Sequence, residues 1–421
     1  YFGDVTFTQS TRPLALGRYI VEAPEAWSLH FRRPDVEHTE VSARPGDAAA
    51  PEGFNVQGYE WTDAPAVQTD PHMPGYTDVY DYIVVSNKKS WDAVGRWWWN
   101  LIEEQLIVND AIAKKVDALT RGPTSRRGKL EAIHNWVVKN TRYLHVGLGI
   151  HGWKPYKTTA AFNNKYGDCK DKAALLKVML EEAGIPTQLV LVRTRRMGHV
   201  TDAPPNMHIF NHAIDYIPSM DLFLDPTAEF NGTTQLTPMD QGAQALVIQD
   251  GGNARFTTLP VDEPDQNRTE VTYEISLDGD QTTTRGTWTA YGQKAVELRQ
   301  ALQDPERRDE VFEKQLANRF QGAELKEATY QHLTDLEQPT KIEFSFTGGR
   351  IERSSGGQPY VVPLATPRDF LQTWAPQPDR SQDRKIAYPR TGVATVRFDP
   401  GEGRRFASIP EPVSYDNAFA S

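Results

Sequence analysis

Cys169 is the only cysteine among the 421 residues, so no intramolecular disulfide bond can hold this fold together. It lies in the segment 166–173, which reads YGDCKDKA. Apolar residues recur at helical spacing after it, and the run ends at Gly184 and Pro186. We therefore predict a helix that begins at Cys169, with Asp168 as its N-cap.

This position favours a reactive thiol. Free backbone N–H groups and the helix dipole at a helix start stabilise a thiolate, and Lys170 and Lys172 add positive charge nearby. The alternative is that Cys169 is a small buried hydrophobic residue. We interpret it as a nucleophile.

Composition excludes several other classes of protein. The net charge of −10 and a pI near 5.6 argue against nucleic acid or an anionic membrane surface as the main partner. No apolar stretch approaches the roughly 20 residues of a membrane-spanning helix. The chain starts at Tyr1 without a signal peptide, which leaves its compartment open.

Three regions differ in their sequence pattern, and together they predict an α+β protein. Residues 1–105 contain short alternating runs broken by turn signals, which predict a β-sandwich-like domain. Residues 106–250 contain helical and strand patterns, including helices at 111–119 and 125–139. Residues 251–421 are β-rich with one inserted charged helix, and the stretches 250–253 and 260–267 are predicted linkers.

A base and an orienting carboxylate for Cys169 are predicted on a β-hairpin. Two strand-like segments, 210–217 and 221–225, flank a turn at Pro218-Ser219. A two-residue turn would pair Ile217 with Met220 and place His212 opposite Asp225, with Cβ atoms roughly 5 Å apart. The carboxylate would then accept the imidazole Nδ1–H and leave Nε2 for the thiol.

Three segments together resemble signatures of bacterial transglutaminase-like proteins: YGDCKDKA at 166–173, FNH at 210–212 and LDPT at 224–227. Their order is that of a papain-like Cys-His-Asp core, in which a helix-borne cysteine packs on an antiparallel sheet. The regions before and after this core resemble the β-rich domains that often flank it. By this resemblance the N-terminal domain is expected to be truncated, with its first strands preceding Tyr1.

The resemblance implies a role for each of these residues. Cys169 would be the nucleophile, His212 the general base and acid, and Asp225 the orienting carboxylate. The indole N–H of Trp153 would join the Cys169 backbone N–H in an oxyanion hole, with Tyr143 as the substitute. We expect no cofactor and no metal, since His208 and His212 lie in strand-like sequence rather than on one helix face.

The function implied is acyl transfer through a Cys169 thioester, on peptide or glutamine side-chain amides. Proteolysis, deamidation and amide cross-linking differ only in what attacks that thioester. The alternative is a latent or non-catalytic scaffold that binds partners through its flanking β domains, for example by accepting a donated strand or its own missing N-terminal segment. The resemblance favours a periplasmic or cell-envelope location and a protein or peptide substrate.

Overall fold

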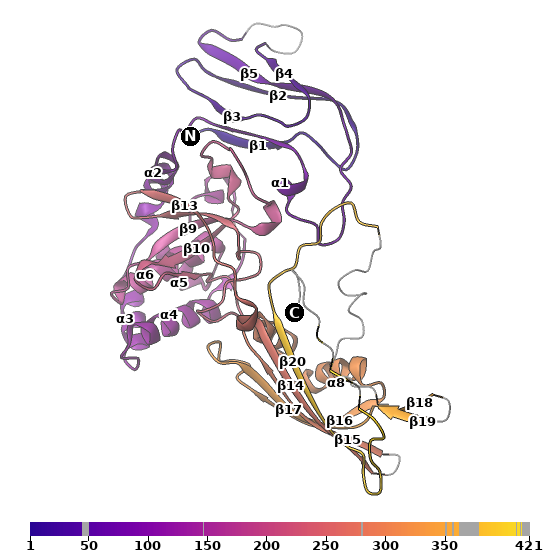
Figure 1. Cartoon of the computed structure of the whole chain (residues 1–421). Helices are drawn as coiled ribbons and strands as arrows, with labels where there is room; N and C mark the ends of the chain where they lie inside the picture. Colours follow the sequence, from indigo (N-terminus) through magenta and orange to yellow (C-terminus); the bar gives the residue numbers. More distant parts are fainter. Residues whose placement is uncertain are drawn as a thin grey trace. The chain divides into compact units, whose positions relative to one another are not determined.

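The computed structural model describes most of the chain (Figure 1). The described residues are 1–43, 50–145, 147–278, 281–349, 352–355, 358–361, 379–409, 411–412 and 414. Contacts divide the chain into two units. Unit 1 comprises residues 1–266 and 376–390, and unit 2 comprises residues 267–375 and 391–421.

The N-terminal part of unit 1 consists of two antiparallel three-stranded sheets. One has the order β1-β6-β3, with β1 at Gly3–Phe7, β6 at Tyr82–Ser86 and β3 at His30–Arg32. The other has the order β2-β5-β4, with β2 at Leu14–Pro24, β5 at Phe54–Ala64 and β4 at His38–Val41. Alternate residues of β5, including Tyr59 and Trp61, pack against Ile83 of β6. A short helix, α1 at Tyr76–Val79, precedes β6.

A group of helices follows these sheets in the chain. They are α2 at Trp91–Ile102, α3 at Asp110–Thr120, α4 at Arg126–Asn140, α5 at Thr158–Asn164 and α6 at Cys169–Glu182. The side chains of Ser90, Asn109 and Ser125 accept hydrogen bonds from the first turns of α2, α3 and α4, which fixes where those helices begin. Between α4 and α6, two short parallel strands pair: β7 at Arg142–Tyr143 and β8 at Tyr166–Gly167.

The central sheet of unit 1 has five antiparallel strands in the order β11-β10-β9-β12-β13. Their bounds are β9 at Gln188–Arg193, β10 at His212–Ile217, β11 at Leu222–Leu224, β12 at Gln244–Ile248 and β13 at Ala254–Thr258. Helix α6 is buried along most of its length, and its Ala173 joins Leu191 and Ala213 of the sheet in one apolar cluster. The predicted helix on an antiparallel sheet is therefore confirmed.

One predicted linker lies inside this sheet. The stretch 250–253 is the turn of the β12–β13 hairpin, where Gly251 and Gly252 adopt positive φ. The linker prediction there is wrong, because a glycine-rich turn and a linker share the same composition. The sheet thus runs beyond residue 250, and the division between the units falls after Gln266, at the end of the second predicted linker.

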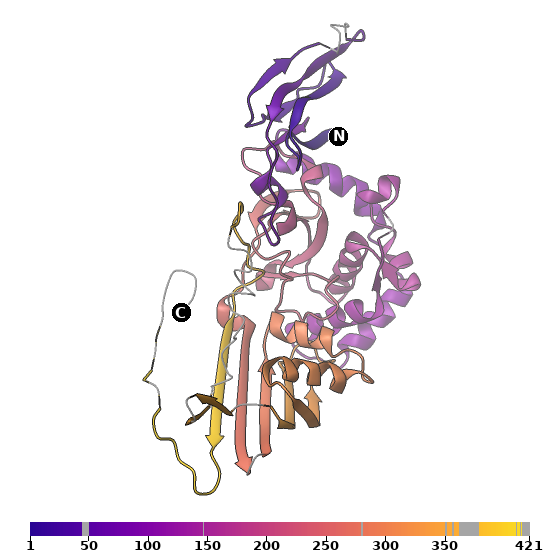
Figure 2. The same ribbon diagram turned by 90° about the vertical axis from the view of Figure 1, so that its right-hand side faces the viewer.

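Unit 2 is a single five-stranded sheet with helices against one face (Figure 2). Its order is β16-β17-β15-β14-β20. The strands are β14 at Arg268–Asp278, β15 at Gln281–Ala290, β16 at Ala323–Gln331, β17 at Thr340–Gly348 and β20 at Thr391–Asp399, and a separate pair is β18 at Glu352–Ser355 with β19 at Gln358–Val361. The single helix predicted here is two helices, α7 at Gln293–Ala301 and α8 at Arg308–Arg319.

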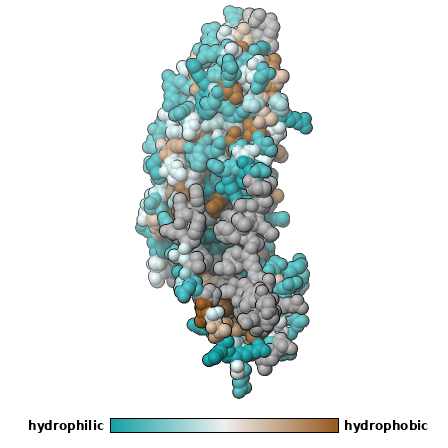
Figure 3. Space-filling view, turned by 45° about the vertical axis from the view of Figure 1, so that its right-hand side comes forward, coloured by the Kyte–Doolittle hydropathy of each residue, from teal (hydrophilic) through white to brown (hydrophobic). Residues whose placement is uncertain are grey.

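The face of the molecule in Figure 3 is mostly hydrophilic, with apolar residues in small groups. Among the residues that the structure describes, no helix combines the length and the apolar character needed to cross a membrane.

Candidate active site

The start of α6 holds Cys169 as the sequence predicts. Asp168 is the N-cap, and it forms a reciprocal capping box with Asp171, whose Oδ2 accepts from the Asp168 N–H at 3.0 Å. The other oxygen of Asp171 accepts from the Tyr156 N–H at 2.8 Å, which ties the preceding loop to the helix. At Gly167 a Cβ would lie 2.5 Å from the Asp171 Cβ, so this position has no room for a side chain. The backbone around Cys169 is therefore fixed on both sides.

His212 and Asp225 meet, although the predicted hairpin register is wrong. The pairs are Ile217 with Leu222 and Asp215 with Leu224, a shift of two residues from the prediction. The cause is a four-residue connection: Pro218 starts a 3₁₀ turn and Asp221 closes it in the left-handed region. A shift of two keeps every side chain on its predicted face, because side chains alternate with a period of two.

The contact itself forms beyond the end of the ladder. Strand β11 ends at Leu224, and Asp225 turns so that its Oδ2 lies 3.3 Å from Nε2 of His212. Its Oδ1 accepts hydrogen bonds from the N–H and the hydroxyl of Thr227, at 2.8 and 2.7 Å. These two bonds fix the orientation of the carboxylate toward the imidazole.

The two imidazole nitrogens have the opposite roles to those predicted. Asp225 contacts Nε2, and His212 also forms a side-chain hydrogen bond with Cys169. Since Nε2 is engaged by the carboxylate, Nδ1 is the nitrogen left for the sulfur. The prediction took the opposite arrangement because it placed the carboxylate directly across the ladder rather than beyond its end.

Electrostatics favour a charged His212 and a charged Asp225. Burial opposes charge on the imidazole, but the Asp225 charge and the hydrogen bonds of the imidazole to Asp225 and Cys169 outweigh it and raise the pKa of His212 well above its usual value. Burial likewise opposes charge on Asp225, yet the His212 charge and the His212 and Thr227 hydrogen bonds lower its pKa to about 2. The pair is therefore an imidazolium and a carboxylate at neutral pH.

Of the two residues proposed for the oxyanion hole, Tyr143 interacts with the Cys169 charge, and Trp153 borders the same apolar cluster as Cys169. Tyr143 is partly exposed, and burial together with the charge of Cys169 raises the pKa of its hydroxyl. Trp153 packs on the same apolar cluster as Cys169, its ring lies edge-on to His208 at 4.9 Å, and its carbonyl accepts from the Trp98 indole at 3.0 Å. Their catalytic roles remain predictions.

Two further ionisable residues at this site have no sequence signal of their own. Asp240 lies in the turn before β12. One of its carboxyl oxygens lies within 4.8 Å of a ring nitrogen of His212 and of a carboxylate oxygen of Asp225. Lys172 is fully buried on α6, donates to the Thr141 carbonyl and faces the charge of Asp225. Burial lowers the pKa of this lysine to about 8. Lys172 was noted in the sequence only for its charge, and the fold alone brings Asp240 here.

In the part of the chain that the structure describes, one group of side chains could offer a metal ion three ligand atoms. Its members are His212, Asp225 and Asp240. His212 and Asp225 already bind each other, through Nε2 and Oδ2. His208, the partner considered in the sequence, stacks instead with Tyr1 at 6.0 Å and lies in a separate turn.

Asp215 gives a stability prediction for this sheet. Its carboxyl is fully buried on β10, no donor among the described residues bonds to it, and burial raises its pKa well above the usual value. A raised pKa in the folded state means that stability falls as pH rises above about 4, the value in an unfolded chain. Asp215→Asn should therefore raise the unfolding temperature at pH 8 by a few degrees. The gain should shrink toward pH 4 in thermal scans, and an equal gain at both pH values would contradict this explanation.

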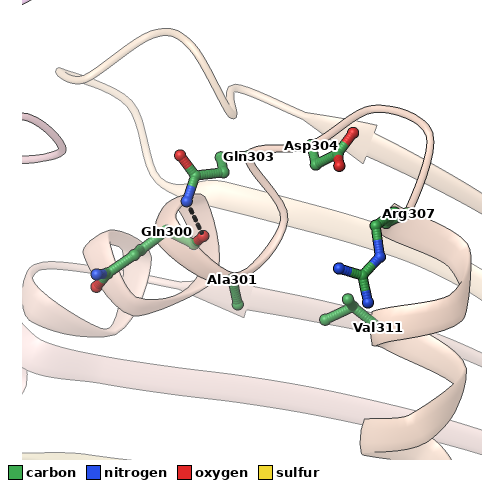
Figure 4. A pocket seen from close by; sticks show the side chains of 6 residues that line it. All are labelled: Gln300, Ala301, Gln303, Asp304, Arg307 and Val311. Atoms are coloured by element: carbon green, nitrogen blue, oxygen red, sulfur yellow. Dashed lines mark hydrogen bonds between the residues drawn. The ribbon is translucent and has the colours of Figure 1, made fainter.

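A hollow lies in unit 2, between the end of α7 and the start of α8 (Figure 4). Its volume is about 490 Å³, and its lining residues are Gln300, Ala301, Gln303, Asp304, Arg307 and Val311. The Gln303 amide donates to the Gln300 carbonyl at 3.1 Å. The lining has no cysteine, histidine or hydroxyl nucleophile, so the chemistry described above belongs to unit 1.

Part of this chain matches a known family of proteins. Residues 113–217 match the family model of the Transglutaminase-like superfamily, so the chain carries a transglutaminase-like domain. This range includes Cys169 and His212 and ends before Asp225. No curated protein matches the chain.

Two solved structures are similar to this chain, and one of them supports the fold. A crystal structure from Parabacteroides distasonis, described as a "putative protease", has a TM-score of 0.51 at 13% identity and covers 86% of this chain and 70% of its own. A second, described as a "putative cysteine protease" from Cytophaga hutchinsonii, has a TM-score of 0.24 at 13% identity and covers 61% of this chain and 86% of its own. The first likeness supports the transglutaminase-like fold.

Proposed function

We propose that this chain is a cysteine-dependent acyl-transfer enzyme that acts on peptide or glutamine side-chain amides through a thioester at Cys169. One observation carries the proposal. A cysteine at a helix start is hydrogen-bonded to a buried histidine, which in turn contacts a buried carboxylate. Nucleophile, base and orienting group are thus in contact in the required order.

The first half of the reaction forms the thioester. The Cys169 sulfur attacks the amide carbonyl, and the His212 imidazolium donates its proton to the leaving amine as the C–N bond breaks. The Cys169 backbone N–H, free at the helix start, and the Trp153 indole or the Tyr143 hydroxyl would stabilise the oxyanion. Asp225 holds the imidazole and supports its positive charge.

The second half transfers the acyl group. His212, now neutral, takes a proton from a water or an amine as that group attacks the thioester, and the C–S bond breaks to regenerate the thiolate. Water gives proteolysis or deamidation, and an amine gives a cross-link. By the resemblance stated above, the substrate would be a protein or peptide of the periplasm or cell envelope.

Alkylation of Cys169 tests whether the sulfur is activated, and it requires no knowledge of the substrate. An imidazolium–thiolate pair reacts with iodoacetamide at acidic pH, where a free thiol is almost wholly protonated. We expect Cys169 to react at pH 6 at least about tenfold faster than free cysteine. The rate is measured between pH 5 and 9, with mass spectrometry to confirm the site. A rate equal to that of free cysteine throughout would contradict the proposal and favour a binding or scaffold protein.

A peptide screen then identifies the reaction. Glutaminyl peptides are incubated with the intact protein, with and without an added amine. New N-termini would indicate proteolysis, ammonia release without cleavage would indicate deamidation, and incorporation of the amine would indicate cross-linking.

A further inference from the structure

Asp240 is a carboxyl beside His212 and Asp225 that the mechanism above does not use. Its side chain is fully buried, with 0% of its surface exposed. Its Oδ2 accepts from the Thr237 hydroxyl at 2.7 Å, and its Oδ1 receives no hydrogen bond from any donor among the described residues. An ionised oxygen left in that state would be strongly unfavourable.

The neighbour that explains this oxygen is another carboxylate. A carboxyl oxygen of Asp240 lies within 4.8 Å of one of Asp225, and both residues lie beside His212. A side-chain hydrogen bond with Asp225 contributes to the raised pKa of Asp240. Asp225 has no proton to give, because it already accepts from His212 and from Thr227. The donor in this bond must therefore be a protonated Asp240.

We infer that Asp240 is a positioning residue that shares a proton with Asp225, and that loss of this proton makes the pair hold the His212 imidazolium more strongly. The inference rests on the proposed function, because it concerns how the base of that reaction is controlled. With the proton in place, the two carboxyls carry one negative charge beside the imidazole. Without it they carry two.

The charges around Asp240 agree with this reading. Burial and the Asp225 charge raise the pKa of Asp240 to about 7, against the opposing effects of His212 and the Thr237 hydroxyl. Two positively charged side chains lie in this region. The buried Lys172 of α6 faces Asp225. The Arg195 guanidinium, which follows β9, contacts the carbonyl of Pro238, two residues before Asp240. The charge of each carboxyl changes the pKa of the other, so the two titrate as a pair in which Asp240 carries the proton.

This arrangement would divide the two half-reactions by pH. The first half needs an imidazolium to protonate the leaving amine, and the second needs a neutral imidazole to accept a proton. At a pH above that at which the pair loses its proton, the two carboxylates carry two negative charges, which favour the imidazolium and so the first half-reaction. At a lower pH the pair carries one negative charge, attracts the imidazolium less strongly and lets His212 lose its proton more readily.

The test is the titration of His212 in Asp240→Asn. Asparagine can still donate to Asp225 and accept from Thr237, but it never becomes charged. We expect His212 to lose its proton about one pH unit or more lower than in the wild type, a tenfold change in the equilibrium. The titration is followed by NMR of histidine labelled at Cε1, with the His212 signal assigned by its loss in His212→Gln.

Two further variants keep the result interpretable. Thr237→Val removes a donor to the ionised form of Asp240 and should move the titration of the pair to higher pH. Asp215→Asn removes another buried carboxyl, on the same strand as His212, and should leave the His212 titration within about 0.3 pH units. Unfolding temperatures of all variants establish that they fold.

An unchanged His212 titration in folded Asp240→Asn would overturn the inference, and a lower unfolding temperature alone would make Asp240 merely structural. Failure of the proposed function looks different. In that case Cys169 of the wild type reacts with iodoacetamide no faster than free cysteine, whatever Asp240 does.

Discussion

Replacing Cys169 by alanine should abolish turnover of any amide substrate, by at least about 10³-fold, since removal of a covalent nucleophile leaves only binding and oxyanion stabilisation. The side chain is partly exposed and packs at the margin of an apolar cluster, so the fold should survive. We expect the unfolding temperature to stay within about 2 °C. Initial rates and thermal scans on the same preparation measure both quantities.

Serine at position 169 is the matched control, because it keeps the size and hydrogen-bonding capacity of cysteine. It should lose activity to a similar extent, since a serine hydroxyl is far less ionised than a thiol beside an imidazolium. If Cys169→Ala keeps more than a tenth of the wild-type rate, another residue is the nucleophile and the proposed mechanism is wrong.

Asp225→Asn should lower turnover by about 10⁴-fold, as the corresponding change does in a serine protease. Asparagine has no negative charge to stabilise the positive charge on His212. Its amide can also turn an N–H group toward Nε2 of His212, the nitrogen that donates to Asp225 in the wild type. Cys169 alkylation at pH 6 should also fall toward the rate of free cysteine. Enzyme rates and alkylation rates together separate this effect from simple unfolding.

The same substitution has a signature in stability. The pKa of Asp225 is lowered to about 2 in the folded chain, below the roughly 4 of an unfolded one. Its contribution to stability is therefore fully present above pH 4 and is lost as pH falls toward 2. Asp225→Asn should unfold at a lower temperature than the wild type at pH 7, and the difference should narrow below pH 4.

Asp221→Asn is the matched control on the same hairpin. It removes an identical charge from an exposed position, at a left-handed residue that asparagine tolerates well. We expect turnover within about twofold of the wild type and no pH-dependent loss of stability. Equal losses in the two variants would mean that the hairpin, and not the contact between Asp225 and His212, governs the effect.

The sequence was most informative where the physics is local. The N-cap at Asp168 and the helix beginning at Cys169 depend on neighbouring residues, and both are confirmed. The contact between His212 and Asp225 was predicted from a hairpin register that is wrong by two residues. The contact still forms, because a shift of two residues leaves each side chain on the same face of the sheet. Which imidazole nitrogen meets the carboxylate depends on how far beyond the strand Asp225 turns, and no spacing rule contains that information.

Asp240 could not be found in this way. It lies in the turn before β12, and β12 pairs with β9 rather than with β11, the strand before it in the sequence. Val192 of β9 is flanked by His212 on one side and Ala245 on the other, so the strand order brings the turn beside the histidine. Strand order is set by packing of the whole sheet, which local patterns do not encode.

The return of residues 376–390 to unit 1 has a consequence for how the protein is made. Within this segment, the carbonyls of Ile386 and Ala387 accept from the Arg195 guanidinium, and the Lys385 N–H donates to His72. A ribosome adds about 5–20 residues per second, so these partners emerge on the order of ten seconds after Gln266. Until then Arg195 lacks those two acceptors, so the unit that holds Cys169 is completed only after strands β14 to β17 of unit 2 have been synthesised.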